Sequence, residues 1–390
     1  MVGAAPGVPS LEGGGKAILK ERGTEVNLVI SGYYGFKNLG DEAVLLSTIQ
    51  ALRESLPGAR ITVLSHDPGH TAQAYGVEAV NRWNIREVFR ALRDSQMLLS
   101  GGGSLFQDIT SRRNLYYYLG IVQMARCLRV PVAVYAQGIG PLLRLSSRWI
   151  TARVLNQVQL ITVRDGDSER LLRDIGVNRP PIHVTADPVL GLNPEEMDLT
   201  PGLDLARRMG IQGKVLAFSV RFWPGAEALW EALAFLGDKW QKEGGQVVFI
   251  PFHFPLDVEA SREVARRMTE APVIIEEELD VFTLMGLLKT ATLLMGMRLH
   301  ALIFAAVMEV PFLGLAYDPK VQAFAQRAEQ PCLDLKNFSP SDLVEKGEFF
   351  WACREEHRLK LKAALPALRD KARENACLVA DFLQRCWKNR

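Results

Sequence analysis

The sequence lacks the cysteine patterns of a disulfide framework and of a zinc site. Its five cysteines are odd in number and widely spaced, and no two of them form a C-x-x-C pair. This usage is typical of a protein kept in a reducing compartment. No cluster of potential ligands has metal-site spacing, so we expect no metal. The cysteines are Cys127, Cys332, Cys353, Cys377 and Cys386.

The sequence also lacks a membrane-spanning run and a secretory signal. The longest apolar stretch, 301–317, contains Glu309 and Pro311, so it predicts a buried helix followed by a buried strand. Residues 1–23 are rich in glycine, alanine and proline, with no apolar core behind a basic start, and predict a flexible tail. We therefore expect a cytoplasmic protein.

An excess of one charge is absent as well. The 390 residues include 46 Lys and Arg against 44 Asp and Glu, which gives no reason to expect a nucleic-acid partner. Residues 354–390 alone carry ten Lys and Arg against five Asp and Glu. A solvated helical face explains this excess. The alternative is peripheral contact with the inner face of an anionic membrane.

What the sequence does contain is apolar material in a regular alternation. Hydrophobic residues make up 48% of the chain, which is too long for one ordinary core. From Val26, short apolar runs alternate with helical patterns, as in parallel sheets built from βαβ units. Strands are expected at 26–31, 60–65, 96–100, 131–136, 160–163 and 182–186, and then at 215–220, 246–252, 272–276, 292–296 and 310–316.

The alternation predicts an α/β fold with two Rossmann-like domains. After the tail (1–23), we expect an N-terminal domain at 24–195, a C-terminal domain at 196–338 and C-terminal helices at 339–390 that break at Pro366. The linker is expected within 193–213, which is rich in Pro, Gly and Asp. Ligands bind such sheets beyond the carboxyl ends of the strands. The residues that follow each strand are therefore the candidates.

Glycine-rich loops follow the strands of the first half: GYYGFKNLGDEAVLL (32–46), SGGGSLFQD (100–108) and AQGIGPL (136–142). Glycine lets backbone N–H groups approach a ligand, and a helix N-terminus attracts anions. A tight turn capped by Asp41 is the alternative for the first loop. The spacing is not G-x-G-x-x-G, which disfavours a dinucleotide site. The candidate glycines are Gly32, Gly35, Gly40, Gly101, Gly102, Gly103 and Gly138.

Polar and charged residues follow the remaining strands. In the first half, Arg164, Asp165 and Asp187 have this position, although either aspartate can serve only as a turn cap. Arg148 lies near the start of a helix, where a solvated surface arginine is the alternative. In the second half the charged candidates indicate an anion-binding pocket with one titratable histidine, His300. These second-half candidates are Arg221, His253, Arg298, His300, Asp318 and Lys320.

At this point the motifs resemble a known family, the polysaccharide pyruvyl transferases, and within it the bacterial CsaB type that modifies a secondary cell-wall polymer. The resemblance extends from about residue 26 to about residue 325, and Lys37 departs from the small or polar residue expected in its loop. The segments that carry it are GYYGFKNLGDEAVL, LLSGGGSLFQD, AQGIGPL, ITVRD, SVRFW, IPFHFPLD and GMRLHALIFAA.

The resemblance implies a GT-B-like architecture, with terminal helices bridging back to the first domain. It implies transfer of pyruvate from phosphoenolpyruvate to two hydroxyls of one sugar as a ketal, with release of phosphate and without metal or cofactor. The acceptor would be a lipid-linked or polymeric saccharide on the N-terminal side. His300 would be the catalytic acid, with Lys320 and Arg148 binding the donor.

The chemistry assigns further roles within this resemblance. Arg298 and Lys320 would hold the carboxylate or phosphate of the donor, together with Arg221 and His253. His300 would protonate C3, and we expect the bound polyanion to raise its pKa. Asp41 or Glu42 would activate the acceptor hydroxyl.

The sequence leaves three alternative functions open. A nucleotide-sugar glycosyltransferase would use the same architecture, and a non-catalytic relative would retain only the fold. A nicotinamide-dependent dehydrogenase has only Asp67, after the second strand, in its favour.

Overall fold

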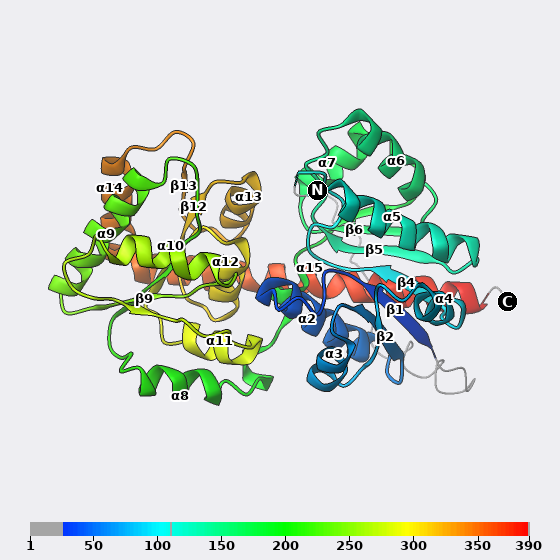
Figure 1. Cartoon of the computed structure of the whole chain (residues 1–390), viewed down its shortest axis with the longest axis horizontal. Coiled ribbons are helices and arrows are strands. Elements are labelled where there is room, and N and C mark those ends of the chain that lie inside the picture. Colours follow the sequence, from blue (N-terminus) through cyan, green and yellow to red (C-terminus); the bar gives the residue numbers. More distant parts are fainter. Residues whose placement is uncertain (1–25, 110, 389–390) are drawn as a thin grey trace, which may run out of the picture.

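The fold consists of two parallel β-sheets, each covered by helices (Figure 1). The computed structural model describes residues 26–109 and 111–388, so the predicted tail lies outside the described residues. The two-sheet α/β fold class predicted from the alternation is confirmed. We call each sheet with its helices a lobe.

The N-terminal lobe contains a seven-stranded sheet in the order β3-β2-β1-β4-β5-β6-β7. The buried side chains of α4, α5 and α6 form one core against this sheet, and those of α2 and α15 form another. The strands are β1 (Asn27–Ser31), β2 (Arg60–Ser65), β3 (Glu78–Asn81), β4 (Met97–Ser100), β5 (Val132–Gln137), β6 (Leu160–Val163) and β7 (Ile182–Val184). The helices are α2 (Leu39–Ser55), α3 (Pro68–Tyr75), α4 (Ile85–Arg93), α5 (Arg112–Cys127), α6 (Leu145–Leu155) and α7 (Gly166–Asp174).

The C-terminal lobe contains a six-stranded sheet in the order β10-β9-β8-β11-β12-β13. Its strands are β8 (Val215–Ser219), β9 (Gln246–Phe249), β10 (Val273–Ile274), β11 (Leu293–Gly296), β12 (Phe312–Ala316) and β13 (Cys332–Asp334). Its helices are α8 (Thr200–Arg208), α9 (Glu227–Lys242), α10 (Leu256–Ala265), α11 (Val281–Leu288), α12 (Leu299–Val307), α13 (Pro319–Arg327) and α14 (Pro340–Ala352). The segment expected to hold the linker includes the short turn η2 (Pro194–Glu196) and α8, which packs on α11.

The strands missing from the sequence prediction are β3 and β13. Each forms one edge of its sheet and pairs with a single neighbour. Their sequences, EAVN and CLD, are short and partly polar because an edge strand buries less of its surface. The inner strands, such as β5 and β8, are buried along their whole length, as the apolar runs predicted.

The C-terminal helix α15 (Arg354–Lys388) contacts both lobes, packing on α2 and β5 as well as on α12 and α14 (Figure 1). The predicted break at Pro366 is wrong, because the helix continues through it. Proline inside a helix costs about 3 kcal/mol. Burial of Leu361, Leu365 and Leu368 around it offsets that cost.

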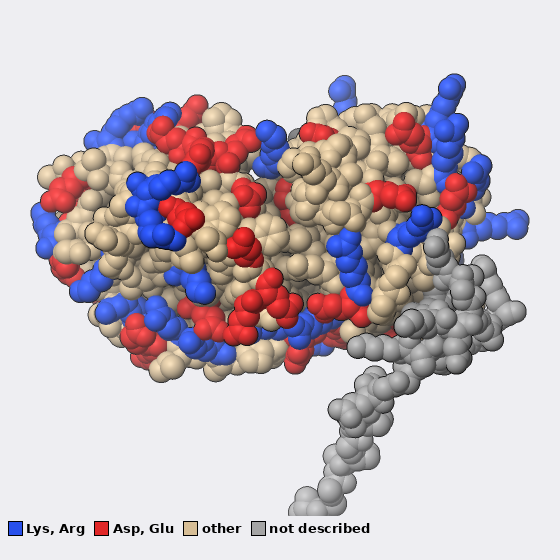
Figure 2. Space-filling view, turned by 90° about the horizontal axis from the view of Figure 1, so that it is seen from below, with Lys and Arg blue, Asp and Glu red and all other residues tan. Residues whose placement is uncertain are grey.

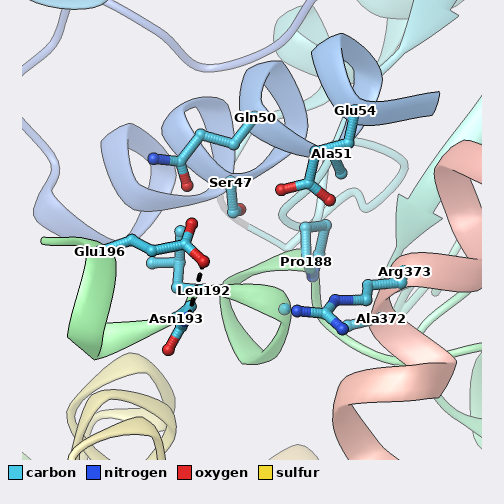
Figure 3. A pocket seen from close by; sticks show the side chains of 11 residues that line it. Ser47, Gln50, Ala51, Glu54, Pro188, Leu192, Asn193, Glu196, Ala372 and Arg373 are labelled. Atoms are coloured by element: carbon cyan, nitrogen blue, oxygen red, sulfur yellow. Dashed lines mark hydrogen bonds between the residues drawn. The ribbon is translucent and has the colours of Figure 1, made fainter. Parts of the chain in front are cut away.

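Two surface features complete the fold. Figure 2 shows basic and acidic side chains interspersed on one face, with the outline narrowing between the lobes. Where α2, the turn η1 (Pro188–Gly191) and α15 meet, a cavity of about 20 Å³ remains (Figure 3), which is room for about one water molecule. No helix among the described residues is both long and apolar enough to cross a bilayer.

Candidate active site

A cleft between the lobes and a side cavity next to it form the candidate site. The cleft has a volume of about 720 Å³ and the side cavity about 410 Å³. The cleft is lined by residues that follow strands of both sheets, as expected for parallel sheets. Five residues line both spaces: Asn38, Ser104, Gln107, Arg164 and His300.

His300 lies in the first turn of α12, with 20% of its side chain exposed. Its Nε2 atom is buried without a hydrogen bond and lies 3.7 Å from Oδ2 of Asp187. Burial lowers the pKa of His300 to about 4; Asp187 opposes this shift, whereas Arg164 and Arg298 add to it. The imidazole is therefore neutral at pH 7 while no anion occupies the cleft.

The first glycine loop brings the N-terminal lobe against this histidine. Helix α2 begins after Asn38, whose side chain accepts hydrogen bonds from the backbone N–H groups of Gly40 and Asp41. A β-carbon on Gly40 would collide with Nδ1 of His300. Glycine at position 40 thus makes room for a side chain of the other lobe, whereas the approach of a ligand to this loop stays a prediction.

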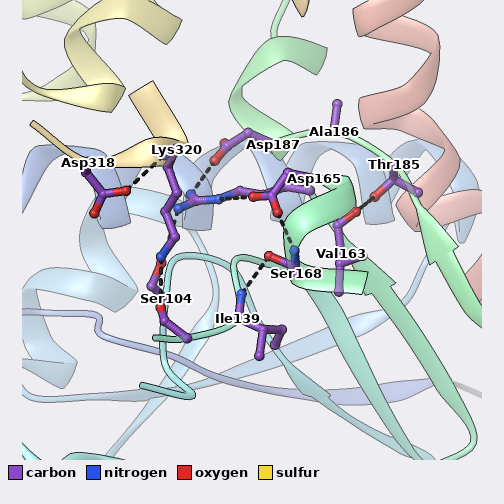
Figure 4. A network of polar contacts seen from close by, with 12 residues as sticks. Ser104, Ile139, Val163, Asp165, Ser168, Thr185, Ala186, Asp187, Asp318 and Lys320 are labelled. Carbon is purple, nitrogen blue, oxygen red and sulfur yellow. Dashed lines mark hydrogen bonds and ion pairs between the residues drawn. The ribbon is translucent and has the colours of Figure 1, made fainter. Parts of the chain in front are cut away.

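Arg164 is the centre of a buried polar network that includes Asp187 and Ser104. Figure 4 shows these two partners close to Lys320. Nη1 of Arg164 donates to Oδ2 of Asp187 at 3.0 Å, and its Nη2 donates to Oγ of Ser104 at 3.1 Å. Gly138 makes room for the guanidinium, since a β-carbon there would lie 2.8 Å from Nε. Asp187 therefore lies between Arg164 and His300 and can stabilise a charged imidazole.

Lys320 extends from α13 across the cleft to the N-terminal lobe. Its Nζ donates to Oγ of Ser104 at 3.1 Å and to the carbonyl of Gly140 at 3.0 Å. Burial lowers the pKa of Lys320 to about 8, and Arg164 adds to the shift. The ammonium is thus poorly solvated, and an anionic ligand would stabilise its charge.

Arg298 lines the cleft, but half of its hydrogen-bonding fork is already in use. Its Nε donates to Oδ2 of the buried Asp257 at 2.9 Å, and its Nη2 donates to Oδ1. This edge of the guanidinium therefore neutralises Asp257. The two hydrogens of Nη1 and the second hydrogen of Nη2 are left for a ligand, so the predicted role of Arg298 in donor binding stays a prediction.

Arg221 and His253 also line the cleft. Arg221 donates to the hydroxyl of Tyr317 at 2.9 Å and lies over its ring. His253 is exposed and follows β9. Both predicted candidates thus belong to the same space as Arg298 and Lys320.

Asp41 lines the side cavity rather than the cleft. Burial raises its pKa to about 7, with further contributions from Glu42 and Asp187 and an opposing one from Arg164. Gly103 lies close, since a β-carbon there would be 2.7 Å from Oδ1 of Asp41. Asp41 can therefore gain and lose a proton near neutral pH, as a general base requires.

An aromatic stack forms part of the side-cavity wall. Tyr33 lines the cavity and stacks on Phe36 with ring centroids 4.1 Å apart, and Phe36 stacks on His66 at 4.4 Å. Burial and the nearby Asp41 raise the pKa of Tyr33. The cavity thus combines a rigid ring with a titratable carboxyl group.

Two of the predicted catalytic and donor-binding residues lie outside both spaces. Glu42 is buried, and its carboxylate accepts from the backbone N–H of Gly35 at 2.9 Å and from the hydroxyl of Tyr75 at 2.7 Å. Arg148 is exposed on α6 and donates from Nε to the carbonyl of Leu142. The structure gives Glu42 a scaffolding position and does not bring Arg148 to the cleft.

The other candidate glycines pack within the N-terminal lobe. A β-carbon on Gly32 or Gly101 would meet the ring or hydroxyl of Tyr34. One on Gly102 would collide with Val44, and one on Gly35 with Ser65. At these four glycines an added β-carbon would meet atoms of the N-terminal lobe, so their lack of a side chain allows the loops to pack.

The sequence placed Arg164 and Asp187 after strands but gave them no role in the reaction, and it did not single out Ser104. The signal was present, because ITVRD and TADPV follow the adjacent strands β6 and β7. Both aspartates after these strands do cap turns, since Asp165 accepts from the Ser168 N–H and Asp187 from the Val189 N–H. Asp187 has both functions because its second oxygen faces Arg164.

Over the ranges 26–109 and 111–388 there is no group of three or more His, Cys, Asp or Glu side chains that could hold a metal ion. Asp67, the one feature in favour of a dehydrogenase, caps α3 by accepting from the N–H of His70.

The sequence of residues 38–319 matches the family described as polysaccharide pyruvyl transferase. Among curated protein sequences none matches the chain significantly.

Solved structures of low sequence identity share the fold. S. aureus MnaA in complex with UDP has a TM-score of 0.63 and 13% identity, covering 90% of this chain and 94% of its own. Anabaena HepE with UDP-glucose has a TM-score of 0.61 and 10% identity, covering 94% and 100%. The UDP-GlcNAc 2-epimerase of Neisseria meningitidis bound to UDP-GlcNAc has a TM-score of 0.60 and 12% identity, covering 93% and 100%. At such identities the likeness shows a common two-lobed, GT-B-type fold.

Proposed function

Because the chain belongs to the polysaccharide pyruvyl transferase family, we propose that it transfers pyruvate from phosphoenolpyruvate to a saccharide as a cyclic ketal and releases phosphate. The observation that carries this proposal is the place of His300. Its side chain lines both the cation-rich cleft and the side cavity that contains Asp41. A donor in the cleft and an acceptor in the side cavity would therefore both lie next to this histidine.

The donor would bind in the cleft. Phosphoenolpyruvate carries a phosphate and a carboxylate. Four cationic side chains border the cleft, three from the C-terminal lobe and one from the N-terminal lobe. Charge-assisted hydrogen bonds of this kind are about twice as strong as neutral ones. These cations are Arg164, Arg221, Arg298 and Lys320.

The reaction would begin with proton transfer from His300 to C3 of the donor. The C2–C3 double bond supplies the electron pair for the new C–H bond, and an acceptor hydroxyl adds to C2. The C2–O bond to phosphate then breaks with its electron pair on the phosphate. A second hydroxyl closes the ring. One hydroxyl proton replaces the proton given to C3, and the other leaves with phosphate.

His300 is neutral before the donor binds, so the donor itself must promote protonation. A dianion near the imidazole favours the charged form, and Asp187 at 3.7 Å acts in the same direction. We assign Asp187 a positioning role, because it would support the imidazolium without contacting the donor.

The acceptor sugar would bind in the side cavity. Asp41, with a pKa raised to about 7, would take the proton of the attacking hydroxyl. The ring of Tyr33, supported by its stack, would pack against the apolar face of the sugar. In this proposal the acceptor is a polymeric or lipid-linked saccharide of a secondary cell wall, as for the CsaB type, and the reaction is cytoplasmic and uses no metal or cofactor.

The experiment that tests the proposal is phosphate release from phosphoenolpyruvate with acceptor in the His300→Ala variant. Loss of a positioned acid is expected to lower the rate by about 10²–10⁴-fold. The thermal transition should remain close to that of the wild type. Undiminished turnover would remove His300 from the mechanism, and a strict metal requirement revealed by a chelator would contradict the metal-free reaction.

A nucleotide-sugar enzyme is the second candidate, since the structural neighbours are described with UDP or UDP-sugars. Thermal shifts separate the two functions because a ligand that binds the native state stabilises it, by about 2.7 kcal/mol at one hundred times its Kd. We expect phosphoenolpyruvate to raise Tm and UDP-GlcNAc to have no effect. The reverse result would favour the second candidate.

A further inference from the structure

Large exposed apolar side chains gather on one part of the N-terminal lobe. The fold brings these side chains together, because they come from three separate helix starts along the chain. Of the thirteen most exposed large apolar side chains among the described residues, eight belong to the stretch 83–149. We call this surface the α4–α6 edge; its members are Trp83, Ile85, Phe89, Ile109, Tyr116, Leu143, Leu145 and Trp149.

These eight side chains lie at one end of three neighbouring helices. Each is in the loop before α4, α5 or α6 or within the first five residues of that helix. Helix α5 contacts both α4 and α6, and all three belong to one layer on the sheet (Figure 1). The carboxylate of Asp108 accepts from the backbone N–H groups of Leu143 and Arg144, which ties the loop before α5 to the start of α6.

The same stretch is strongly basic. Residues 82–153 contain eleven arginines, no lysine and three acidic residues, although the whole chain has 46 basic and 44 acidic residues. The three acids are engaged: Glu87 by Asn84, Asp94 by Arg93, and Asp108 by the start of α6. In the described part of the chain, five exposed arginines in these loops or within the first five residues of these helices form no ion pair with a carboxylate: Arg86, Arg112, Arg113, Arg144 and Arg148.

The α4–α6 edge adjoins the cleft. The starts of these helices follow the carboxyl ends of β3, β4 and β5, which is the side of the sheet where the cleft opens. Ile109 of the edge and Pro141, two residues before Leu143, line the cleft itself. A molecule held at the edge would therefore be next to the entrance of the candidate site.

We propose that the α4–α6 edge docks on the surface of a bilayer that contains anionic phospholipid. Arginine side chains attract anionic headgroups, while Trp, Tyr and Leu side chains insert at the boundary between headgroups and acyl chains. Tryptophan is part of this arrangement, since Arg153 lies over the ring of Trp149. Such docking would bring the cleft to a lipid-linked substrate without a membrane-spanning segment.

For residues 354–390, membrane contact was the alternative to a solvated helical face. The apolar side chains of α15, including Leu365, Ala376 and Val379, are buried in the cores of the two lobes. Among the side chains of α15 that the structure describes, Leu359 is the one large apolar side chain that is exposed beside the basic residues. A solvated helical face accounts for the charge of α15, and the membrane contact belongs to the α4–α6 edge.

The test is co-sedimentation of the full chain with vesicles of phosphatidylcholine, with and without phosphatidylglycerol. The Leu145→Glu/Trp149→Glu variant changes side chains that are 81% and 61% exposed, so its fold should be preserved. The Phe235→Glu variant is the matched control, on a side chain 56% exposed on α9 in the other lobe. Leu359→Glu tests α15 in the same way, at 68% exposure.

We expect wild-type protein to bind only the anionic vesicles, and less as salt is added. The Leu145→Glu/Trp149→Glu variant should lose this binding, and Phe235→Glu and Leu359→Glu should keep it. Replacing Arg112 and Arg113 by Gln should weaken binding about fivefold for each arginine.

Three results would overturn the proposal. The first is that wild-type protein does not bind anionic vesicles. The second is that Phe235→Glu or Leu359→Glu loses as much binding as Leu145→Glu/Trp149→Glu. The third is that the protein binds no vesicles but self-associates, and that Leu145→Glu/Trp149→Glu abolishes the self-association. The last result would assign the edge to an interface between copies of the chain. Because vesicle binding requires no turnover, this proposal and the proposed reaction can fail separately.

Discussion

At the scale of single residues, the site contains titratable groups whose pKa values are shifted by burial. Burial lowers the pKa of His300 to about 4 and that of Lys320 to about 8, and it raises the pKa of Asp41 to about 7. Each shift favours the neutral form of its group. An anionic ligand would reverse this preference for the two bases, which couples donor binding to protonation.

The first prediction concerns the pKa of His300. Without ligand it should titrate near 4, because burial and the two arginines oppose the imidazolium. Phosphoenolpyruvate should raise this pKa, since the bound anion favours the charged ring. NMR titration of the imidazole, assigned among the six histidines with a His300→Gln variant, measures both values. A pKa unchanged by saturating phosphoenolpyruvate would contradict the proposed acid.

The second prediction concerns Asp41 and stability. Its folded pKa, about 7, lies above the unfolded value of 3.8, so its contribution to stability is present below pH 3.8 and is lost as pH rises through 7. The Asp41→Asn variant does not titrate there. The free energy of unfolding of the variant minus that of the wild type should therefore increase between pH 4 and 8, by something on the order of 2–4 kcal/mol.

Urea unfolding of both proteins across this pH range measures the difference. His300 titrates in both proteins, so its own effect cancels. A difference that stays constant with pH would mean that Asp41 has an ordinary pKa and would remove the reason for making it the base.

At the scale of elements, the starts of helices place the functional groups. Helix α12 presents His300, α13 presents Lys320, and α2 presents Gly40 and Asp41. The sequence located these positions because each follows an apolar strand. It did not reveal that Gly40 faces a histidine of the other lobe, or that Asp257 occupies half of Arg298, because such contacts depend on how distant segments pack.

The sequence did not predict the short edge strands β3 and β13 or the continuous helix through Pro366, because these also depend on packing. Local preference argues against each of them. Pairing with β2 and β12, and burial of α15 between the lobes, override that preference.

The third prediction tests the contact between α2 and α12. In Gly40→Ala the new β-carbon would collide with His300, so the imidazole must move and activity should fall nearly as far as in His300→Ala. The matched control is Gly166→Ala at the start of α7, where nothing lies within 4 Å of the added carbon. That variant should keep full activity and equal or higher stability, since alanine favours helix over glycine by about 1 kcal/mol.

Phosphate-release assays of the two variants, with thermal melts, measure this contrast. Full activity in Gly40→Ala would show that the position of His300 against α2 is unimportant for the reaction.

At the scale of the whole molecule, a few polar contacts join the lobes across the cleft. Lys320 reaches Ser104 and Gly140, and Arg327 donates to the carbonyls of Arg164 and Thr185. Lys37, the residue that departs from the family pattern, pairs with Glu278 at 3.1 Å. Its exposed ion pair should contribute little to stability, about 0–1 kcal/mol. Helix α13 supplies both Lys320 and Arg327 to these contacts between the lobes. The donor would compete with Ser104 and Gly140 for Lys320.

The measurement that tests the central claim most directly is a crystal structure with phosphoenolpyruvate bound. We predict the phosphate or carboxylate within hydrogen-bond distance of Lys320 and of Nη1 of Arg298, and C3 facing the imidazole of His300. Lys320 should then have exchanged at least one of its contacts with Ser104 and Gly140 for the ligand. Phosphoenolpyruvate bound away from His300, or a cleft left empty at saturating donor, would contradict the account.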